Sequence, residues 1–571
     1  MGRALQSLMS KFSRLSVLGC VAVVACLLVP VACMTPNKAI KESDEVGSRL
    51  ATEFWRKQTG ATNVFDIGRP SDALTLRIAL LAVSRGEQGV VFPKLPGVGA
   101  LSVSNSVLNL SFRDALCVAA RNDRQYQKLK ETVFADALDV DYQRFLFDTS
   151  FTGVLLALLS GDPNAKKVSG EAEPGFAHEF ENGAKLAGNM ALNVASLLRE
   201  DWRSLGLSGD LTMAVPLMRG SGRDIVREPL TQAERDLVYS IHTFEAYRQS
   251  YAVTVASAYL GVLEYAQRLQ NALDNERNLK KNARRAEMLF EAGRMQKIQA
   301  DQALSDQLDA SSGVISVRKT YETLLDSFKI TLGLPPESKI VLDRRELDLL
   351  QRGMTHLLKS TRSAIERFPE EREACRIALE NRHDLFVIRG EVDDAVRAVK
   401  VAADQLRADV VLKGTGNLDR TRETGDNGFS GNETWSSSLS ADLPWNRHKE
   451  RNAYKKKLIV LDQARRTLEA EEDTVKQSVR NGLRNLVAAR ATFEVELEAV
   501  RVAQRRVDSN SLFLLSGRST MRDVLEAQDS LLTEQNAFCD ALINWRNCDL
   551  ALRRDMGVLR ISDAGIWQEG D

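Results

Sequence analysis

Two carboxylates three residues apart, Asp523 and Glu526, are the residues whose type and spacing could do chemistry in this chain. Within a helix this spacing places both side chains on one face. Neighbouring carboxylates attract cations and repel one another, so an arrangement built from them responds to salt and protonation. The alternative interpretation is a pair of solvated surface acids, continued by Asp529.

Signatures of enzymatic chemistry are absent from the sequence. It contains no GxxxxGKS/T phosphate loop, no HExxH metal motif and no GxSxG nucleophile motif. Gly220-Ser221-Gly222 lacks a dinucleotide-binding context and is interpreted as a turn between a strand and a helix. The seven cysteines form no CxxC pair and the five histidines are scattered, which disfavours a metal site. We therefore expect no enzymatic activity and no cofactor.

Long helical patterns must position the two acids. Between Leu230 and Ala292 only Gly261 interrupts a charged, Ala-rich helical pattern, which at about 1.5 Å per residue spans roughly 95 Å. Residues 447–516 give a comparable pattern, and residues 519–556 run back. Apolar positions step by three, four or seven, as in a coiled-coil seam. The sequence predicts long helical hairpins that pack side by side, and helices of this length lead us to expect oligomerisation.

Each hairpin turns at a Gly-Arg pair, Gly293-Arg294 in one and Gly517-Arg518 in the other. Glycine supplies the left-handed conformation that ends one helix before the next begins. A turn is all that the pattern requires, but tips at the ends of such helices are also candidate contact points. The second tip is preceded by the apolar run Leu512–Leu515.

Short segments with a period of two lie between the helices. Over about ten residues each, apolar side chains alternate with Ser, Thr, Asn and Gly. The segments are 186–194, 207–217, 410–417 and 435–443, and Phe145–Leu156 is a fifth candidate. A soluble half-buried sheet gives the same signal. The long flanking helices and the export signal described below favour strands of an outer-membrane barrel.

The chain contains an internal duplication. Ala115–Asn122 is repeated 259 residues later as Ala374–Asn381, and a helical run, alternating segments, a proline and a long helix follow each copy. A period this large excludes a solenoid and indicates that a whole unit of helices and strands is used twice.

Residues 1–33 have the pattern of an export signal. Arg3, Lys11 and Arg14 form a basic start, and the uncharged run Leu15–Ala32 follows. Ala32-Cys33 resembles the lipobox of bacterial lipoproteins, and we favour Cys33 over Cys26 as the lipidated residue. An uncleaved membrane anchor is the alternative, because the run barely reaches spanning length.

The balance of charged residues argues against nucleic acid as a partner. The 571 residues include 77 basic and 77 acidic side chains, so no net field attracts nucleic acid. The four cysteines beyond the export signal, Cys117, Cys375, Cys539 and Cys548, sit singly in helical patterns and are expected to be small buried side chains.

Over residues 106–556 the chain resembles the TolC family of outer-membrane efflux proteins. The resemblance is carried by the twofold repeat, the strand end Leu211–Leu217, the Gly-Arg tips and Asp523–Gln528, which is similar to the family's "DVLDAQ" helix. It implies a mainly α fold with a small β part. Duplicated long helical hairpins would form a periplasmic tunnel, and four short strands per chain would contribute to a trimeric, 12-stranded outer-membrane β-barrel. A periplasmic adaptor and an inner-membrane pump would act as partners.

The resemblance also assigns sites. Asp523 and Glu526 would form carboxylate rings around a threefold axis and close the periplasmic end; repeat one has Gln299 and Gln302 at the equivalent places. Adaptor docking would fall on the tip residues, which are Gly293, Arg294, Gly517, Arg518 and Ser519.

These observations give a domain plan: an export signal over 1–33, a tether or strap over 34–105, repeat one over 106–345, repeat two over 346–556 and a tail over 557–571. We expect a trimeric outer-membrane channel that serves as the passive exit duct of a tripartite efflux or type I secretion system. The alternative is a periplasmic coiled-coil adaptor or structural lipoprotein.

Overall fold

The computed structural model describes residues 34–60, 64–65, 103–104, 107–161, 166–197, 203–360, 370–423, 428–443 and 445–562. Two compact units share these residues. Unit 1 takes its residues from 1–65, 133–240 and 389–466, and unit 2 from 66–132, 241–388 and 467–571. Four helices continue from one unit into the other, namely α6 (Arg124–Phe145), α8 (Glu228–Glu291), α12 (His383–Asp404) and α13 (His448–Leu515).

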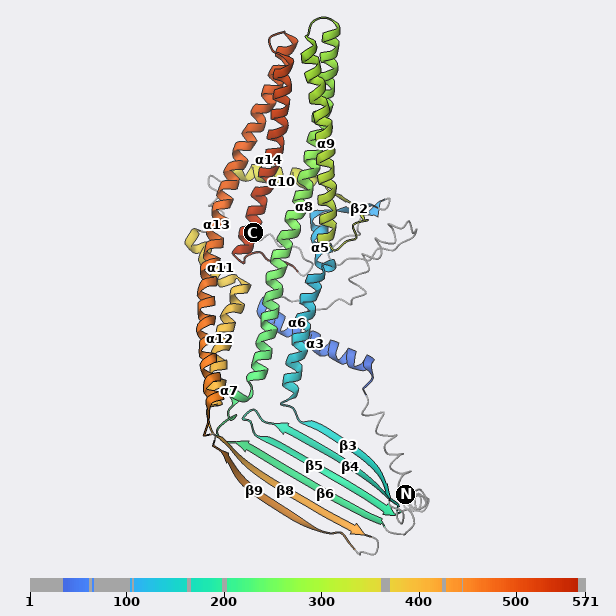
Figure 1. Ribbon diagram of the computed structural model, residues 1–571, viewed down its shortest axis with the longest axis vertical. Coiled ribbons are helices and arrows are strands. Elements are labelled where there is room, and N and C mark those ends of the chain that lie inside the picture. Colours follow the sequence, from blue (N-terminus) through green and yellow to red (C-terminus); the bar gives the residue numbers. More distant parts are fainter. Residues whose placement is uncertain are drawn as a thin grey trace. The chain divides into compact units, whose positions relative to one another are not determined.

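A six-stranded antiparallel sheet dominates unit 1 (Figure 1). The strands lie in the order β3-β4-β5-β6-β8-β9, and each pairs with its neighbours in antiparallel register. Their bounds are Ser150–Gly161, Lys166–Glu179, Lys185–Leu197, Arg203–Pro216, Asp409–Glu423 and Ser430–Asp442. Because β6 pairs with β8, the two halves of the duplication join within one sheet.

The register gives this sheet one apolar and one polar face. Phe151, Phe176, Gly188 and Leu211 are cross-strand neighbours on one face, and Gly416 and Trp435 continue the same row. The opposite face carries Ser, Thr, Asn and acidic residues, of which Thr152, Asn189, Asp210, Asn417 and Thr434 form another cross-strand series. Since side chains alternate along every strand, the in-phase register keeps the two faces separate over most of the sheet. The exceptions are Val154 and Leu156 of β3, which share the polar face, and the Arg420–Glu433 ion pair, which lies on the apolar face.

The predicted strands of both repeats are present as β5, β6, β8 and β9. The fifth candidate is β3, although it begins at Ser150 because Phe145 ends helix α6. Strand β4 was missed: Pro174 lies in its interior, and proline is normally confined to edge strands. The mainly α fold class with a small β part is confirmed, and the large sheet has six strands, two more than the four per chain that the family resemblance implied for the barrel.

Helix α3, Pro36–Thr59, belongs to unit 1 and lies in the segment predicted as a tether. It packs closely on the part of α6 that lies in this unit: a Cβ at Gly47 would come within 2.5 Å of the Phe134 ring. Its Trp55 ring lies 5.1 Å from that of Phe65. The apolar contacts explain why residues without a strong helical signature adopt one stable helix.

The duplication is visible in the lengths of the helices. Helices α5, Phe112–Asn122, and α11, Glu371–Asn381, both have 11 residues. The next helices, α6 (Arg124–Phe145) and α12 (His383–Asp404), both have 22. Matching core positions also recur, because Ala115 and Ala119 of α5 and Ala374 and Ala378 of α11 are all buried.

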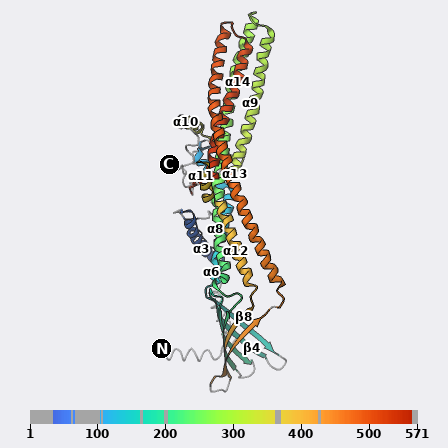
Figure 2. The same cartoon turned by 90° about the vertical axis from the view of Figure 1, so that its left-hand side faces the viewer.

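Two helical hairpins are the largest elements of the chain, and both views show the partners of each hairpin side by side (Figures 1 and 2). The first joins α8, Glu228–Glu291, to α9, Lys297–Thr331; the second joins α13, His448–Leu515, to α14, Met521–Asp555. The predicted bounds are confirmed to within three residues. Gly293 and Gly517 have φ values of 69° and 70°, which is the left-handed conformation that the turns require.

A small sheet supports the hairpins within unit 2. Strand β2, Val107–Leu110, pairs with β1, Val103–Ser104, and in parallel with β7, Lys339–Leu342. Leu108 and Leu110 lie in a core with Tyr259 of α8 and Phe328 of α9. The remaining helices are α7, Arg223–Val226, in unit 1, and α10, Arg345–Ser360, in unit 2.

Candidate functional site

The candidate site lies in unit 2, at the start of α14. Thr520 caps this helix: its Oγ1 accepts from the backbone N–H of Asp523, and the Asp523 carboxylate accepts in return from Thr520 N at 2.8 Å. Thr520 Oγ1 and Ser519 Oγ also donate to that carboxylate. These donors lower the pKa of Asp523. Asp523 therefore holds the beginning of α14, a role that the i, i+3 spacing did not reveal.

Glu526 is placed differently. Its carboxylate pairs with Arg506 Nη2 of α13 at 3.2 Å, and both side chains are well exposed. One turn further along α14 lies Asp529, and both acids line a cavity of about 840 Å³ between α8, α9 and α14. Of the two predicted gate acids, only Glu526 borders this cavity.

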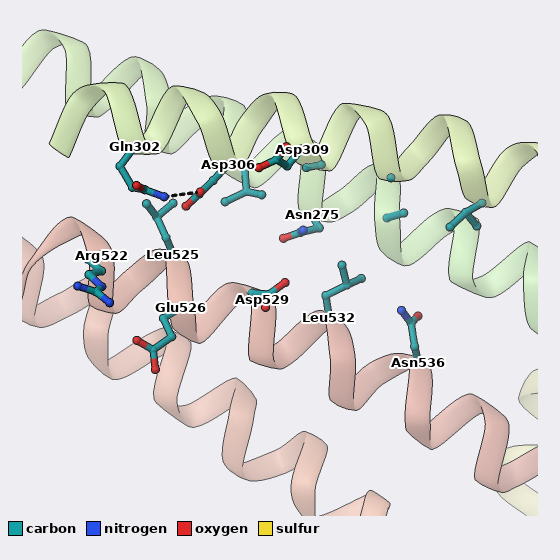
Figure 3. Close-up of a pocket in the computed structure, with 15 residues that line it drawn as sticks. Asn275, Gln302, Asp306, Asp309, Arg522, Leu525, Glu526, Asp529, Leu532 and Asn536 are labelled. Carbon is teal, nitrogen blue, oxygen red and sulfur yellow. Dashed lines mark hydrogen bonds between the residues drawn. The ribbon is translucent and has the colours of Figure 1, made fainter. Parts of the chain in front are cut away.

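Acids from a second helix face the same cavity (Figure 3). Asp306 and Asp309 project from α9, and Gln302 donates to Asp306 Oδ1 at 2.9 Å. Gln302 was expected as the repeat-one counterpart of a gate acid, whereas Gln299 is not among the lining residues. Asp306 and Asp309 were missed, although their i, i+3 spacing repeats that of Asp523 and Glu526.

Small apolar side chains hold the two hairpins together beside the cavity. Met521 and Leu525 of α14 are buried against Leu279, Ala286 and Ala303 of the first hairpin. An amide hydrogen bond of 2.9 Å from Asn282 Nδ2 to Gln528 Oε1 adds a polar contact between α8 and α14. The alanines allow close helix packing, so the acids that line the cavity have a rigid support.

The chemistry of the cavity is electrostatic. Four lining carboxylates, Asp306, Asp309, Glu526 and Asp529, outnumber one lining guanidinium, Arg522. Such a lining attracts cations or basic side chains and repels anions. Among the described residues no group of three or more His, Cys, Asp or Glu side chains is arranged to hold a metal ion.

The tip of the second hairpin presents apolar side chains. Leu512 and Leu515 are 66% and 70% exposed and Phe513 is half exposed, whereas Leu514 packs on the cluster between the hairpins. The first tip adds Ile298, which is 73% exposed. These exposed residues flank Gly293-Arg294 and Gly517-Arg518, so each predicted docking tip has an apolar neighbour.

The predicted burial of the cysteines holds for two of the four. Cys117 and Cys539 are buried, whereas Cys375 and Cys548 are only partly covered; all four are free thiols. Burial raises the pKa of Cys539 to about 12, so this thiol is not reactive at neutral pH. Cys33 and Cys26 lie outside the described residues.

Comparison with known proteins gives the family. The family model of outer membrane efflux proteins matches residues 374–558, which run from α11 through β8, β9 and the second hairpin. Residues 374–558 therefore correspond to a domain similar to outer membrane efflux proteins. The predicted family is thereby confirmed for this domain, and the domain covers most of predicted repeat two. No protein with a curated description matches the chain.

Solved structures show the same fold over most of the chain. The outer-membrane channel OprN is 14% identical, with a TM-score of 0.55 over 78% of this chain and 89% of that one. The Campylobacter jejuni outer membrane channel CmeC is 13% identical, with a TM-score of 0.55 over 81% and 87%. The outer membrane protein VceC of Vibrio cholerae is 14% identical, with a TM-score of 0.55 over 78% and 96%.

The matching family is described as outer membrane efflux proteins and the structural neighbours as outer-membrane channels, and both agree with the predicted outer-membrane location. Across the described ranges, none of the helices combines the length and the apolar character needed to cross a bilayer.

Proposed function

We propose that the protein is a trimeric outer-membrane channel and serves as the passive exit duct of a tripartite efflux or type I secretion system. A periplasmic adaptor would engage the hairpin tips, and an inner-membrane pump would supply the energy. The chain itself would catalyse no reaction.

One observation carries this proposal: the two-faced sheet leaves its apolar face uncovered. Every residue of β9 is exposed, and Trp435 and Leu439 on the apolar face are 84% and 65% exposed. A soluble half-buried sheet would cover this face with a second layer. A barrel strand instead turns such a face to lipid and its polar face to a water-filled lumen.

Fluorescence of Trp435 tests the lipid contact. In vesicles of brominated phosphatidylcholine we expect quenching of the full-length protein that Trp435→Phe reduces. Trp545 lies in the helical core of unit 2, so Trp545→Phe should leave the quenched fraction intact. A protein that fractionates as a soluble monomer, with no ion conductance in planar bilayers, would support the adaptor alternative and remove the duct.

Within this channel we propose that Glu526 contributes to the periplasmic gate and that Asp523 positions the helix carrying it. Three copies of Glu526 would repel one another and attract cations, while each Arg506–Glu526 pair would tie α14 to α13. The contacts of Asp523 with Thr520 and Ser519 support the separate positioning role.

Conductance separates the two roles. Glu526→Ala should raise single-channel conductance and weaken cation preference, because it removes a carboxylate and an ion pair. Asp523→Asn should lower the unfolding temperature with a smaller effect on ion preference. Unchanged conductance in Glu526→Ala would contradict the role of Glu526 in the gate but not the proposed channel.

We also propose that Gly293, Arg294, Gly517, Arg518 and Ser519 form the adaptor-docking tips. The exposed side chains of Leu512 and Leu515 favour a partner with an apolar contact surface. Leu515→Asp should abolish export in cells and leave conductance of the purified channel unchanged. Wild-type export by this variant would rule out an apolar contact at this tip.

We also propose that Cys33 is lipidated and anchors the protein to the membrane. Metabolic labelling with a palmitate analogue should mark the wild-type protein and fail in Cys33→Ser. Retained labelling in Cys33→Ser and loss in Cys26→Ser would move the modification to the other cysteine.

A further inference from the structure

We propose that strand β9 of one copy pairs with strand β3 of the next, so that each chain contributes all six strands to the barrel. Three six-stranded sheets would then close a barrel of eighteen strands. This inference rests on the proposed trimeric channel and concerns its width and its subunit contact. It assigns the hairpin β3–β4 as part of the barrel wall.

Strand direction permits this closure. The sheet is antiparallel throughout and has an even number of strands, so its two edges, β3 and β9, run in opposite directions. A copy placed beside another therefore brings its β3 antiparallel to the neighbour's β9. The closed barrel would alternate in direction at every pair, as outer-membrane barrels do.

Neither edge strand carries the features that protect an isolated edge. Ser150–Gly161 contains no proline and no charged residue, and Ser430–Asp442 contains no proline and no basic residue. Folded proteins block open edges with prolines, lysines or bulges, because unpaired backbone groups otherwise recruit another strand. Within a membrane, every such group must find a partner. A second copy of this chain satisfies both edges at once.

The apolar face of the sheet continues across the proposed contact. Phe151 and Leu155 of β3 lie on the same face as Trp435 and Leu439 of β9, so pairing of copies extends one apolar band. On the other face Thr152 would meet the hydroxyls of Ser436, Ser438 and Ser440. Beyond Thr152 this face of β3 carries Val154 and Leu156, so the polar wall of the extra hairpin is supplied by Thr152 and by Glu171 and Glu173 of β4.

The consequence is a wide, hydrated lumen. Barrel diameter grows about linearly with strand number, so eighteen strands give roughly 1.5 times the width of twelve. Barrels of 16–18 strands leave an aqueous channel. Glu171 and Glu173 of β4 would add carboxylates to its polar wall. We infer that the duct accommodates hydrated cargo bulkier than a four-strand contribution would allow.

Cysteine pairs test the subunit contact in the full-length protein in outer membranes. Thr152→Cys is combined in turn with Ser436→Cys, Ser438→Cys and Ser440→Cys, followed by copper-phenanthroline oxidation. Thr152 lies at the opposite edge of the same chain's sheet from these serines, so a disulfide must join two copies. The single variants control for the native cysteines.

The matched alternative uses Ala187→Cys on β5, which lies on the same face as Thr152 and in cross-strand register with Ser150, two residues before Thr152. It would adjoin β9 of a neighbour if each chain gave only β5, β6, β8 and β9 to the barrel. We expect covalent dimers and trimers with Thr152→Cys and none with Ala187→Cys. Cross-links with Ala187→Cys and none with Thr152→Cys would contradict the eighteen-stranded barrel but not the trimeric duct. Cross-links from neither strand overturn both.

Discussion

The imidazole rings of His242 and His383 lie together inside unit 2, with their Nδ1 atoms 2.9 Å apart. His242 also stacks on Phe386 at a centroid distance of 3.9 Å. At this Nδ1 distance one ring donates to the other, so the pair holds a proton between two bases. Burial, and then the neighbouring His383, lower the pKa of His242 to about 4, and burial lowers the pKa of His383.

This pair predicts loss of stability at mildly acid pH. The unfolded His242 binds a proton near pH 6.5 and the folded one only near pH 4, so the folded state loses stability as pH falls through that window. We expect a loss of about 2 kcal/mol between pH 7 and pH 5. Urea denaturation at the two pH values measures it. His242→Phe should remove most of the difference, and an equal difference in both proteins would contradict the assignment.

Removal of the helix cap should destabilise the tip of the second hairpin. Thr520→Ala loses the hydroxyl that accepts from Asp523 N, which costs about 1 kcal/mol. Thermal unfolding and hydrogen exchange in the first turn of α14 measure the effect. Thr520→Ser keeps the hydroxyl and is the control. Equal exchange rates in the Ala and Ser variants would show that the cap contributes nothing.

Two glycines in the first hairpin should respond oppositely to alanine. Gly293 has φ of 69°, so Gly293→Ala strains the turn by about 1–2 kcal/mol. Gly261 lies within α8, and an added Cβ meets nothing within 4 Å. Gly261→Ala should therefore stabilise by about 0.5–1 kcal/mol. Denaturation midpoints compare the two. A stabilised Gly293→Ala variant would show that the turn conformation is not required.

The buried Arg248 should control how firmly the segment around Ser562 is held. Its guanidinium donates to Glu245 Oε1 at 2.5 Å, and also to the backbone carbonyl of Ser562 at 2.7 Å. Arg248→Met leaves a buried carboxylate without this donor and should cost about 3 kcal/mol or more. Trypsin should then cleave faster after Arg560, as followed by mass spectrometry.

An exposed pair on the same helix provides the control for Arg248. Arg277 and Asp274 are also three residues apart, but both are well exposed. Arg277→Met should cost less than about 1 kcal/mol and leave cleavage after Arg560 unchanged. Similar losses in both variants would show that burial does not strengthen the Arg248 contacts.

Local patterns were sufficient to predict the repeats, the helical hairpins and five of the six strands of the large sheet. Apolar spacing and the absence of proline from Leu230 onward define α8, the same two features define α13, and Gly293 and Gly517 define the turns. Helix α3 and strand β4 were missed because packing determines them. Helix α3 can pack closely on α6 because Gly47 has no side chain where the Phe134 ring lies. Strand β4 is held by pairing with β3 and β5 on its two sides, despite Pro174.

The candidate site was predicted only in part. The i, i+3 spacing correctly placed Asp523 and Glu526 at the start of one helix, but local hydrogen bonds assign Asp523 to the cap. Asp306 lies more than 200 residues from Glu526, and only the packing of the two hairpins brings both to one cavity. Sequence periodicity decides which face of an element is apolar because it acts over a few residues. Which elements share that face depends on contacts between distant segments, so only the tertiary structure decided the six-stranded sheet and the acidic cavity.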